Sequence, residues 1–361
     1  MDYKGFKKLL RIFVICAALL PLSTGGFGQD IQKLAGYAVD LKQTSASGLS
    51  SGAFMTSQFH VAYSGIFVGA GIIAGGPFYC VGSYSAIPAI MSFEKALDIC
   101  MDPIGGLGPY PEKLVDKAKE FARQGLIDDL DNLKDDKIYI FAGANDQTVK
   151  PKVVEQTDRF YILAGVPEAN IKYVKYIFAG HAILTNHQDD VPCEQTKPPF
   201  INNCDVMQSH MILRQIYGEN LNPAAKTLSG KLIKFDQKEF VDSRRSSMDD
   251  AAEVYVPASC EKETCKVHVV FHGCEQGSAM IGDRYYTTTG YNELADTNNI
   301  IVLYPQARPS MTIPYNPKGC WDFWGYSSPD PDNPTFYTKN APQMSAVMKM
   351  LKRLAEPRKN N

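Results

Sequence analysis

The sequence has few of the features that mark nucleic-acid binding, metal binding or membrane insertion. No cluster of lysine and arginine stands out and the formal net charge is −2, which argues against nucleic acid as a partner. No two cysteines have the C-x-x-C spacing typical of zinc sites, so we expect no metal, and no cofactor motif is apparent. No internal repeat or low-complexity linker divides the chain.

What the chain does have is enough apolar sequence for a large core and a typical export signal. Its 361 residues are 45% hydrophobic, which suits one large or two ordinary domains. Basic residues between positions 4 and 11 precede an apolar run over 12–22 and small residues over 23–28. The run is short for a membrane span, so an uncleaved anchor is the weaker interpretation. We predict a signal peptide over 1–28, a single domain over 29–361, no stable membrane anchor, and secretion or a periplasmic location.

Eight of the nine cysteines follow the predicted signal peptide. An even number in an exported chain favours disulfides over free thiols or zinc ligands. Nearness in sequence suggests three pairs and leaves a fourth by default: Cys80–Cys100, Cys193–Cys204, Cys260–Cys265 and Cys274–Cys320.

Residues 48–52 read Gly-Leu-Ser-Ser-Gly, a G-x-S-x-G pentapeptide. This pattern suits a strand that turns sharply into a helix, because side chains two residues either side of the serine would collide. Such a turn lifts the oxygen of Ser50 clear of the sheet and aims the N-terminus of the helix at it. We expect the strand at 37–41 and the helix at 53–62. A chance match in a loop of small residues is the alternative.

Two further polar residues follow predicted strands. The apolar run 137–143 ends shortly before Asp146, and the alternating segment 171–178 ends shortly before His181. Helices expected at 111–128 and 150–163 separate these strands, which predicts a mostly parallel sheet. Because ligands in such sheets lie beyond the carboxyl ends of the strands, we expect both side chains to face the same site as Ser50.

Ser50, Asp146 and His181 have matching chemistry. Serine needs a base to take its proton, and an imidazole titrates near neutrality and can also return that proton. A buried carboxylate fixes the imidazole tautomer and stabilises its cation. Serine, aspartate and histidine in this order are the catalytic triad of an α/β-hydrolase. Each residue alone is equally explained as a turn, cap or loop residue, so the prediction depends on their joint occurrence.

The strands that usually precede the nucleophile are found late in this chain, at 253–257, 266–271 and 299–305. The second of them runs into His272-Gly273, a dipeptide typical of an oxyanion-hole strand. We therefore predict a circularly permuted α/β-hydrolase fold, whose mostly parallel central sheet is flanked by helices. The backbone N–H groups of Ser51 and Cys274 are the expected oxyanion-hole donors. Two independent domains divided near 220–235 are the alternative.

These motifs together resemble the secreted polyhydroxybutyrate (PHB) depolymerases of the single-domain, circularly permuted type. The resemblance spans about residues 30–350 and is carried by the segments 48–52, 145–146, 180–181, 272–274 and 319–321. It implies hydrolysis of a short-chain hydroxyacid polyester by the triad and oxyanion-hole residues named above. It also implies that Trp321 lies beside the substrate crevice.

Aromatic residues gather in the C-terminal third of the sequence, among them Tyr285, Tyr286 and Trp321. If exposed, these three side chains would bind an apolar polyester chain, whereas core packing is the alternative for each. The expected partner is a polyester or oligoester substrate, and the sequence leaves the oligomeric state open. A feruloyl or acetyl-xylan esterase, or a lipase-like carboxylesterase, would keep the same chemistry. A non-catalytic polymer-binding protein is a third possibility.

Overall fold

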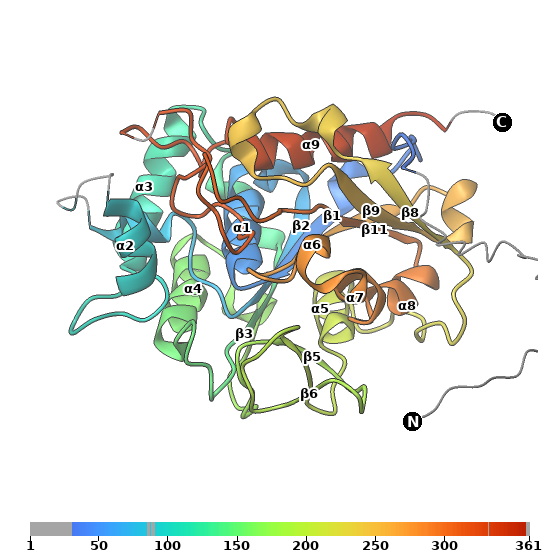
Figure 1. Ribbon diagram of the computed structural model, residues 1–361, viewed down its shortest axis with the longest axis horizontal. Helices are drawn as coiled ribbons and strands as arrows, with labels where there is room; N and C mark the ends of the chain where they lie inside the picture. The colour runs from blue at the N-terminus through green and yellow to red at the C-terminus, as the bar shows by residue number, and fades with distance from the viewer. Residues whose placement is uncertain (1–30, 85–86, 88–90, 331, 359–361) are drawn as a thin grey trace, which may run out of the picture. The chain divides into compact units, whose positions relative to one another are not determined.

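The computed structural model describes residues 31–84, 87, 91–330 and 332–358, and the predicted signal peptide lies outside them. In this part of the chain an eight-stranded sheet runs through the unit that begins at Ile31, in the order β4-β3-β2-β1-β10-β11-β9-β8 (Figure 1). Its strands are β1 (Thr44–Leu49), β2 (Phe67–Ile73), β3 (Lys137–Phe141), β4 (Ile171–Val174), β8 (Lys231–Asp236), β9 (Ala251–Val256), β10 (Lys266–Phe271) and β11 (Ile300–Tyr304).

Strand β1 lies in the middle of this sheet, between β2 and β10, and is parallel to both. The six strands from β4 to β11 are parallel, and β9 and β8 add an antiparallel edge. Thr44 pairs with Val267 and Gly48 with Phe271, so strands from opposite ends of the sequence are direct neighbours. One sheet therefore draws its strands from both halves of the chain, as the predicted permutation requires.

Helices cover both faces of the sheet (Figure 1). The described helices are α1 (Ser51–Ala62), α2 (Ser92–Asp98), α3 (Pro111–Arg123), α4 (Pro151–Leu163), α5 (Gln208–Tyr217), α6 (Ser278–Ile281), α7 (Arg284–Thr287), α8 (Tyr291–Asp296) and α9 (Pro342–Ala355). Strand side chains alternate between two cores. Ile138 and Ile140 join the core that contains residues of α1, α3, α4 and α9, whereas Tyr139 and Phe141 join the core that contains residues of α5, α7 and α8.

The predicted strand at 37–41 is wrong, because the strand before Ser50 is β1, at 44–49. Its sequence, Thr-Ser-Ala-Ser-Gly-Leu, has no apolar pattern, yet all six residues are buried. Two of its serines hydrogen-bond the buried His268 of β10: Ser45 Oγ lies 2.6 Å from Nδ1 and Ser47 Oγ 2.8 Å from Nε2. Small polar residues satisfied by a neighbouring strand take the place of the expected apolar ones.

Between β4 and α5 the chain adds a small parallel sheet that the sequence did not suggest: β5 (Ile183–Thr185), β6 (Val191–Pro192) and β7 (Ile201–Asn203), in the order β5-β7-β6. All four predicted cysteine pairs are formed as disulfides. None of the helices in the described part of the chain has the length and apolarity needed to cross a membrane.

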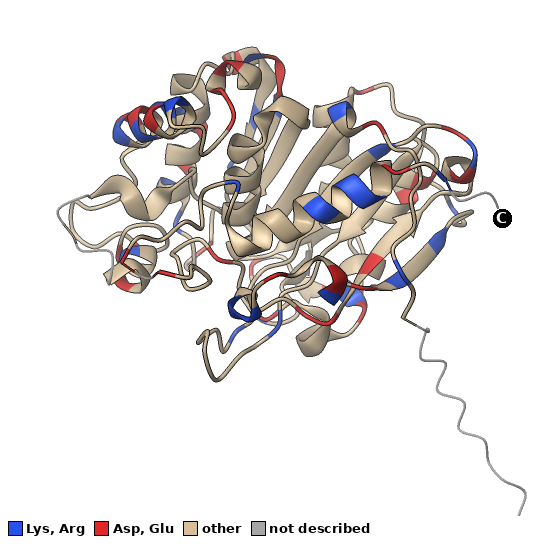
Figure 2. Cartoon of the chain, turned by 90° about the horizontal axis from the view of Figure 1, so that it is seen from above, with Lys and Arg blue, Asp and Glu red and all other residues tan. Residues whose placement is uncertain are grey.

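The segment before β1 lies beside the end of α9. Tyr37 N–H donates to the carbonyl of Leu354 (2.8 Å) and Ala38 N–H to that of Glu356 (2.9 Å). The last turn of α9 carries Lys352 and Arg353, and Figure 2 shows basic residues along this helix. The two ends of the described unit are therefore neighbours, which is what lets a permuted sheet close.

Candidate active site

Ser50 lies on the sharp turn between the end of β1 and the start of α1. Its backbone has φ 58° and ψ −124°, a strained conformation for a residue with a side chain. The flanking glycines are required by close backbone contacts. A Cβ on Gly48 would lie 2.4 Å from the carbonyl oxygen of Gly52, and one on Gly52 would lie 2.4 Å from those of Phe271 and His272. The pentapeptide therefore forms the strand–turn–helix that its sequence predicts.

Asp146 and His181 form a buried pair beyond the carboxyl ends of β3 and β4. Asp146 is fully buried, and its Oδ1 accepts the N–H groups of Thr148 (2.8 Å) and Val149 (3.0 Å). Its Oδ2 lies 2.7 Å from Nδ1 of His181, whose backbone N–H is held by Thr196 Oγ1 at 2.9 Å. An ionised carboxylate only accepts, so this contact places a proton on Nδ1 and leaves Nε2 as the basic nitrogen.

Ser50 and His181 line the same cavity, which has a volume of about 370 Å³. No hydrogen bond joins Ser50 Oγ to the His181 ring in the described part of the chain. Catalytic hydrogen bonds of this kind are often long without substrate and shorten when it binds. The structure thus brings Ser50 and His181 to one cavity, while Asp146 is buried next to it and bonded to the His181 ring.

Gly273 and Cys274 line this cavity as well. A Cβ added to Gly273 would lie only 3.4 Å from Cβ of Ser50, so this backbone passes directly beside the serine. The N–H groups of Ser51 and Cys274 donate to no acceptor in the described residues. Two free backbone donors near a serine oxygen are the arrangement that stabilises an oxyanion.

The aromatic residues predicted to bind substrate do not line the cavity, and Trp321 and Tyr285 lie in the core next to residues 271–272. Trp321 is 0% and Tyr285 2% exposed, and neither these nor the half-buried Tyr286 lines the cavity in the described structure. The Trp321 ring packs against His272 with centroids 5.5 Å apart, and Tyr285 donates its hydroxyl proton to the carbonyl of Phe271 (3.1 Å). Their burial supports the alternative of core packing rather than direct substrate contact.

Sequence reasoning missed most of the remaining lining. Met101, Phe200 and Lys318 come from loops far apart in the chain, and nothing in their local sequence indicates a shared site. Thr148 also lines the cavity, and its place in the polar loop after β3 is a sequence feature that could have indicated this. Leu49, Met101 and Phe200 give the cavity an apolar component beside the reactive side chains.

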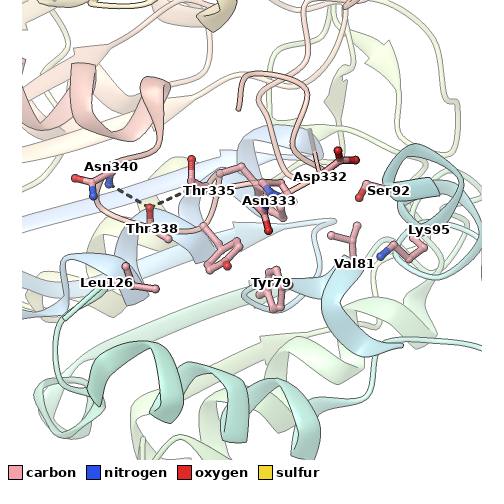
Figure 3. Close-up of a pocket in the computed structure, with 13 residues that line it drawn as sticks. Tyr79, Val81, Ser92, Lys95, Leu126, Asp332, Asn333, Thr335, Thr338 and Asn340 are labelled. Atoms are coloured by element: carbon pink, nitrogen blue, oxygen red, sulfur yellow. Dashed lines mark hydrogen bonds between the residues drawn. The ribbon is translucent and has the colours of Figure 1, made fainter. Parts of the chain in front are cut away.

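A second cavity, of about 380 Å³, is lined by Tyr79 and Val81, residues of α2 and the segment 332–340 (Figure 3). Thr338 Oγ1 accepts from Asn340 N–H (3.2 Å) and donates to the carbonyl of Thr335 (3.0 Å), so these polar groups satisfy one another. No residue of the predicted triad lines it. Of these two cavities, only the one at Ser50 combines a base, a nucleophile and free donors.

Among the described residues, no group of three or more His, Cys, Asp or Glu side chains is arranged to hold a metal ion. His268 and His272 are four residues apart, a spacing that holds zinc when it falls on a helix. Here they belong to a strand and the loop after it, and both rings are engaged in hydrogen bonds. The absence of a metal stays a prediction.

The fold and the site together define one class of protein, the serine hydrolases of the α/β-hydrolase fold. Two solved structures, a PHB depolymerase from Penicillium funiculosum and a serine-to-alanine variant of PHB depolymerase complexed with an R3HB trimer, each superimpose with a TM-score of 0.77 at 32% identity. Each comparison covers 90% of this chain and 99% of the other. The chain belongs to the PHB depolymerase family.

Curated relatives agree with the structural neighbours. The polyhydroxybutyrate depolymerase of Talaromyces funiculosus is 35% identical over 328 residues, 87% of this chain and 88% of that protein. The poly(3-hydroxybutyrate) depolymerase of Delftia acidovorans is 38% identical over 322 residues, 88% of this chain but only 60% of that protein's length. No family model matches the chain. The predicted family, fold class and class of enzyme, a serine-type ester hydrolase, are confirmed.

Proposed function

We propose that this chain is an exported esterase that cleaves poly(3-hydroxybutyrate) or its short oligomers through an acyl-enzyme, with Ser50 as nucleophile and His181 as base. The observation that carries the proposal is the cavity that Ser50 shares with His181, whose Nδ1 is bonded to the buried Asp146. The names of the relatives and the R3HB trimer bound to one structural neighbour support the substrate class. The four disulfides support export.

The reaction begins when Ser50 Oγ attacks the ester carbonyl carbon and passes its proton to Nε2 of His181. Asp146 keeps Nδ1 protonated and stabilises the imidazolium that forms. The carbonyl oxygen becomes an oxyanion, which accepts hydrogen bonds from the N–H groups of Ser51 and Cys274. Each such donor is worth about 3 kcal/mol of transition-state stabilisation.

Collapse of this intermediate breaks the ester bond to the next hydroxyacid unit, whose alkoxide takes the proton from the imidazolium and leaves as an alcohol. The acid portion stays esterified to Ser50. Water then gives a proton to His181 and attacks the acyl carbon. The second oxyanion collapses, the bond to Ser50 Oγ breaks, and the imidazolium returns its proton to that oxygen, which releases the free hydroxy acid and restores the serine. The apolar side chains of Leu49, Met101 and Phe200 suit the methyl-bearing backbone of such a chain.

The test compares wild type with Ser50→Ala on p-nitrophenyl butyrate, 3-hydroxybutyrate trimer, amorphous PHB and feruloylated xylan. We expect hydrolysis of the first three substrates by wild type and a loss of about 10⁴-fold or more in kcat for the variant. Asp146→Asn serves as a matched variant that keeps the hydrogen bonds but supports the wrong tautomer. Equal turnover by wild type and Ser50→Ala would remove the mechanism, and release of ferulate with no action on the trimer would replace the substrate.

A further inference from the structure

His272 is the last residue before the glycine that lies beside the nucleophile, and its ring is 1% exposed. Both ring nitrogens have partners. The N–H of Ala307 donates to Nε2 at 3.0 Å, and Nδ1 lies 2.7 Å from the carbonyl oxygen of Gly273. A backbone amide only donates, so Nε2 carries no proton and the single proton of the neutral ring is on Nδ1. Burial lowers the pKa of His272 to about 4, which is consistent with a neutral ring at neutral pH.

The carbonyl that this ring binds belongs to the peptide bond between Gly273 and Cys274. That bond is planar, and in the trans form its C=O and N–H point in opposite directions. Whatever fixes the Gly273 carbonyl therefore also fixes the direction of the Cys274 N–H, the expected second donor to the oxyanion. Glycine has little intrinsic preference between backbone conformations, so the orientation of this peptide must come from its partners.

Gln276 holds the other side of Gly273. Its Oε1 accepts the Gly273 N–H at 2.7 Å, and its Nε2 donates to the carbonyls of Pro199 (2.7 Å) and Phe200 (3.1 Å), the second of which lines the cavity. The Gln276 N–H adds a longer bond of 3.3 Å to the Gly273 carbonyl. The short bond to that carbonyl is the one from His272.

We infer that His272 is a positioning residue for the oxyanion hole: by donating its Nδ1 proton to the Gly273 carbonyl, it aims the Cys274 N–H at the substrate oxygen. The inference rests on the proposed function, since it presupposes that Cys274 serves an oxyanion at Ser50. It gives the His-Gly dipeptide of this chain a chemical role, and it gives Trp321 one too, since that ring packs against His272 and supports its orientation.

Two substitutions separate the two bonds of the ring. In His272→Asn, the side-chain amide nitrogen stands near the position of Nδ1 and keeps the donor to Gly273, but it does not reach Ala307. In His272→Gln, the amide oxygen stands near the position of Nε2 and keeps the acceptor for Ala307, but the donor to Gly273 is lost. Both remove the ring and its packing against Trp321, so a purely structural role predicts similar losses for the two variants.

We expect His272→Gln to lower kcat for p-nitrophenyl butyrate on the order of 10- to 100-fold, less than the loss of a whole donor because the longer Gln276 bond remains. KM should change by less than about threefold, and His272→Asn should keep kcat within about fivefold of wild type. Inhibition by an alkylboronic acid, whose tetrahedral adduct places an oxygen in the hole, should weaken in parallel with kcat. Equal kcat losses in the two variants, or a larger loss in the Asn variant, would overturn the inference.

A measurement on the wild-type chain does not depend on how well the variants fold. Long-range ¹⁵N–¹H correlation spectra of histidine-labelled protein report the tautomer of each ring, and we expect His272 to carry its proton on Nδ1. A proton on Nε2 would overturn the inference. Failure of the proposed function itself looks different, because wild type and Ser50→Ala would then have equal turnover whatever His272 does.

Discussion

Two buried histidine–aspartate pairs flank the same strand, and only one of them belongs to the candidate site. Asp146 follows the carboxyl end of β3 and bonds His181 at 2.7 Å, whereas Asp136 precedes its amino end and bonds Nε2 of His60 at 2.9 Å. The second nitrogen of His60 is used by the hydroxyl of Tyr161, 3.0 Å away. Nε2 of His181 instead belongs to a ring that borders a cavity.

The comparison teaches that a carboxylate–imidazole bond does not by itself make a base. What matters is the other nitrogen, which is occupied and enclosed in His60 and available in His181. Position in the sheet decides this difference, because the carboxyl ends of parallel strands are where loops leave space for a ligand. At the amino end of β3, Asp136 and His60 form a buried network with Tyr161, which connects the start of β3 to α1 and α4 in the core.

The largest expected effect comes from making the same change in both pairs. His181→Gln should lower kcat/KM for p-nitrophenyl butyrate by about 10⁴-fold, because the serine loses its base, and should also lower the free energy of unfolding by about 2 kcal/mol, because it breaks the buried bond to Asp146. His60→Gln should keep kcat/KM within a few-fold and lower the free energy of unfolding by about 2 kcal/mol, since it breaks a buried network. Steady-state kinetics and urea unfolding on both variants check this. A large loss of activity in the His60 variant with an intact fold would contradict the assignment of a structural role to His60 and a catalytic role to His181.

A smaller effect should follow from Tyr161→Phe. It removes the hydroxyl that donates to Nδ1 of His60 and leaves a buried acceptor unsatisfied, which we expect to cost about 1 kcal/mol of stability. The urea midpoint should fall while kcat and KM stay within twofold. Tyr139→Phe, in the core on the opposite face of the sheet, is a matched control for the loss of a buried hydroxyl. A drop in kcat without a drop in stability would show that this network serves catalysis after all.

The smallest expected effect is a change in how stability depends on pH. Burial raises the pKa of Asp136 above its ordinary value, and the hydrogen bond from His60 offsets this only in part. A carboxyl with a raised pKa stabilises the fold fully below its unfolded pKa of about 3.9, and this contribution is lost as pH rises through the folded value. The side chain at position 136 does not titrate in the Asp136→Asn variant. As the pH rises through the folded pKa of Asp136, the free energy of unfolding should therefore fall less for the variant than for wild type.

Urea unfolding of both chains between about pH 3.5 and 6.5 gives the difference curve, in which the titrations of all other carboxyls cancel. We expect wild type to lose stability relative to Asp136→Asn as the pH rises. A difference that is constant across the range would mean that folding leaves the pKa of Asp136 unchanged, and a difference of opposite sign would mean that folding lowers it; either result would contradict the prediction.

The sequence was most informative where residue type and strand position agreed. Ser50, Asp146 and His181 were predicted because each follows a strand and each has a role in one mechanism. The permutation followed from finding an apolar strand before His272-Gly273 late in the chain. Strand β1 was misplaced because Ser45 and Ser47 are polar, and only the buried His268 on the neighbouring strand makes them compatible with a core.

The cavity lining was harder to predict for a different reason. Met101, Phe200 and Lys318 meet there only because three distant loops converge, and no local pattern encodes such convergence. Trp321 was expected beside the substrate crevice from the resemblance to the PHB depolymerases, and its neighbour Cys320 bonds Cys274. The disulfide does bring the tryptophan near the site, but on the inner side of the wall, against His272.

The order of strands in the sheet has a consequence for the timing of activity. Ser45 and His268, paired in adjacent central strands, are 223 residues apart in the chain. The serine turn is synthesised early, but the backbone that packs against Gly52 and carries Cys274, one of the two proposed oxyanion donors, comes from the last third of the chain. A chain still being synthesised would therefore hold Ser50 without its surroundings, and we expect esterase activity only once synthesis is nearly complete.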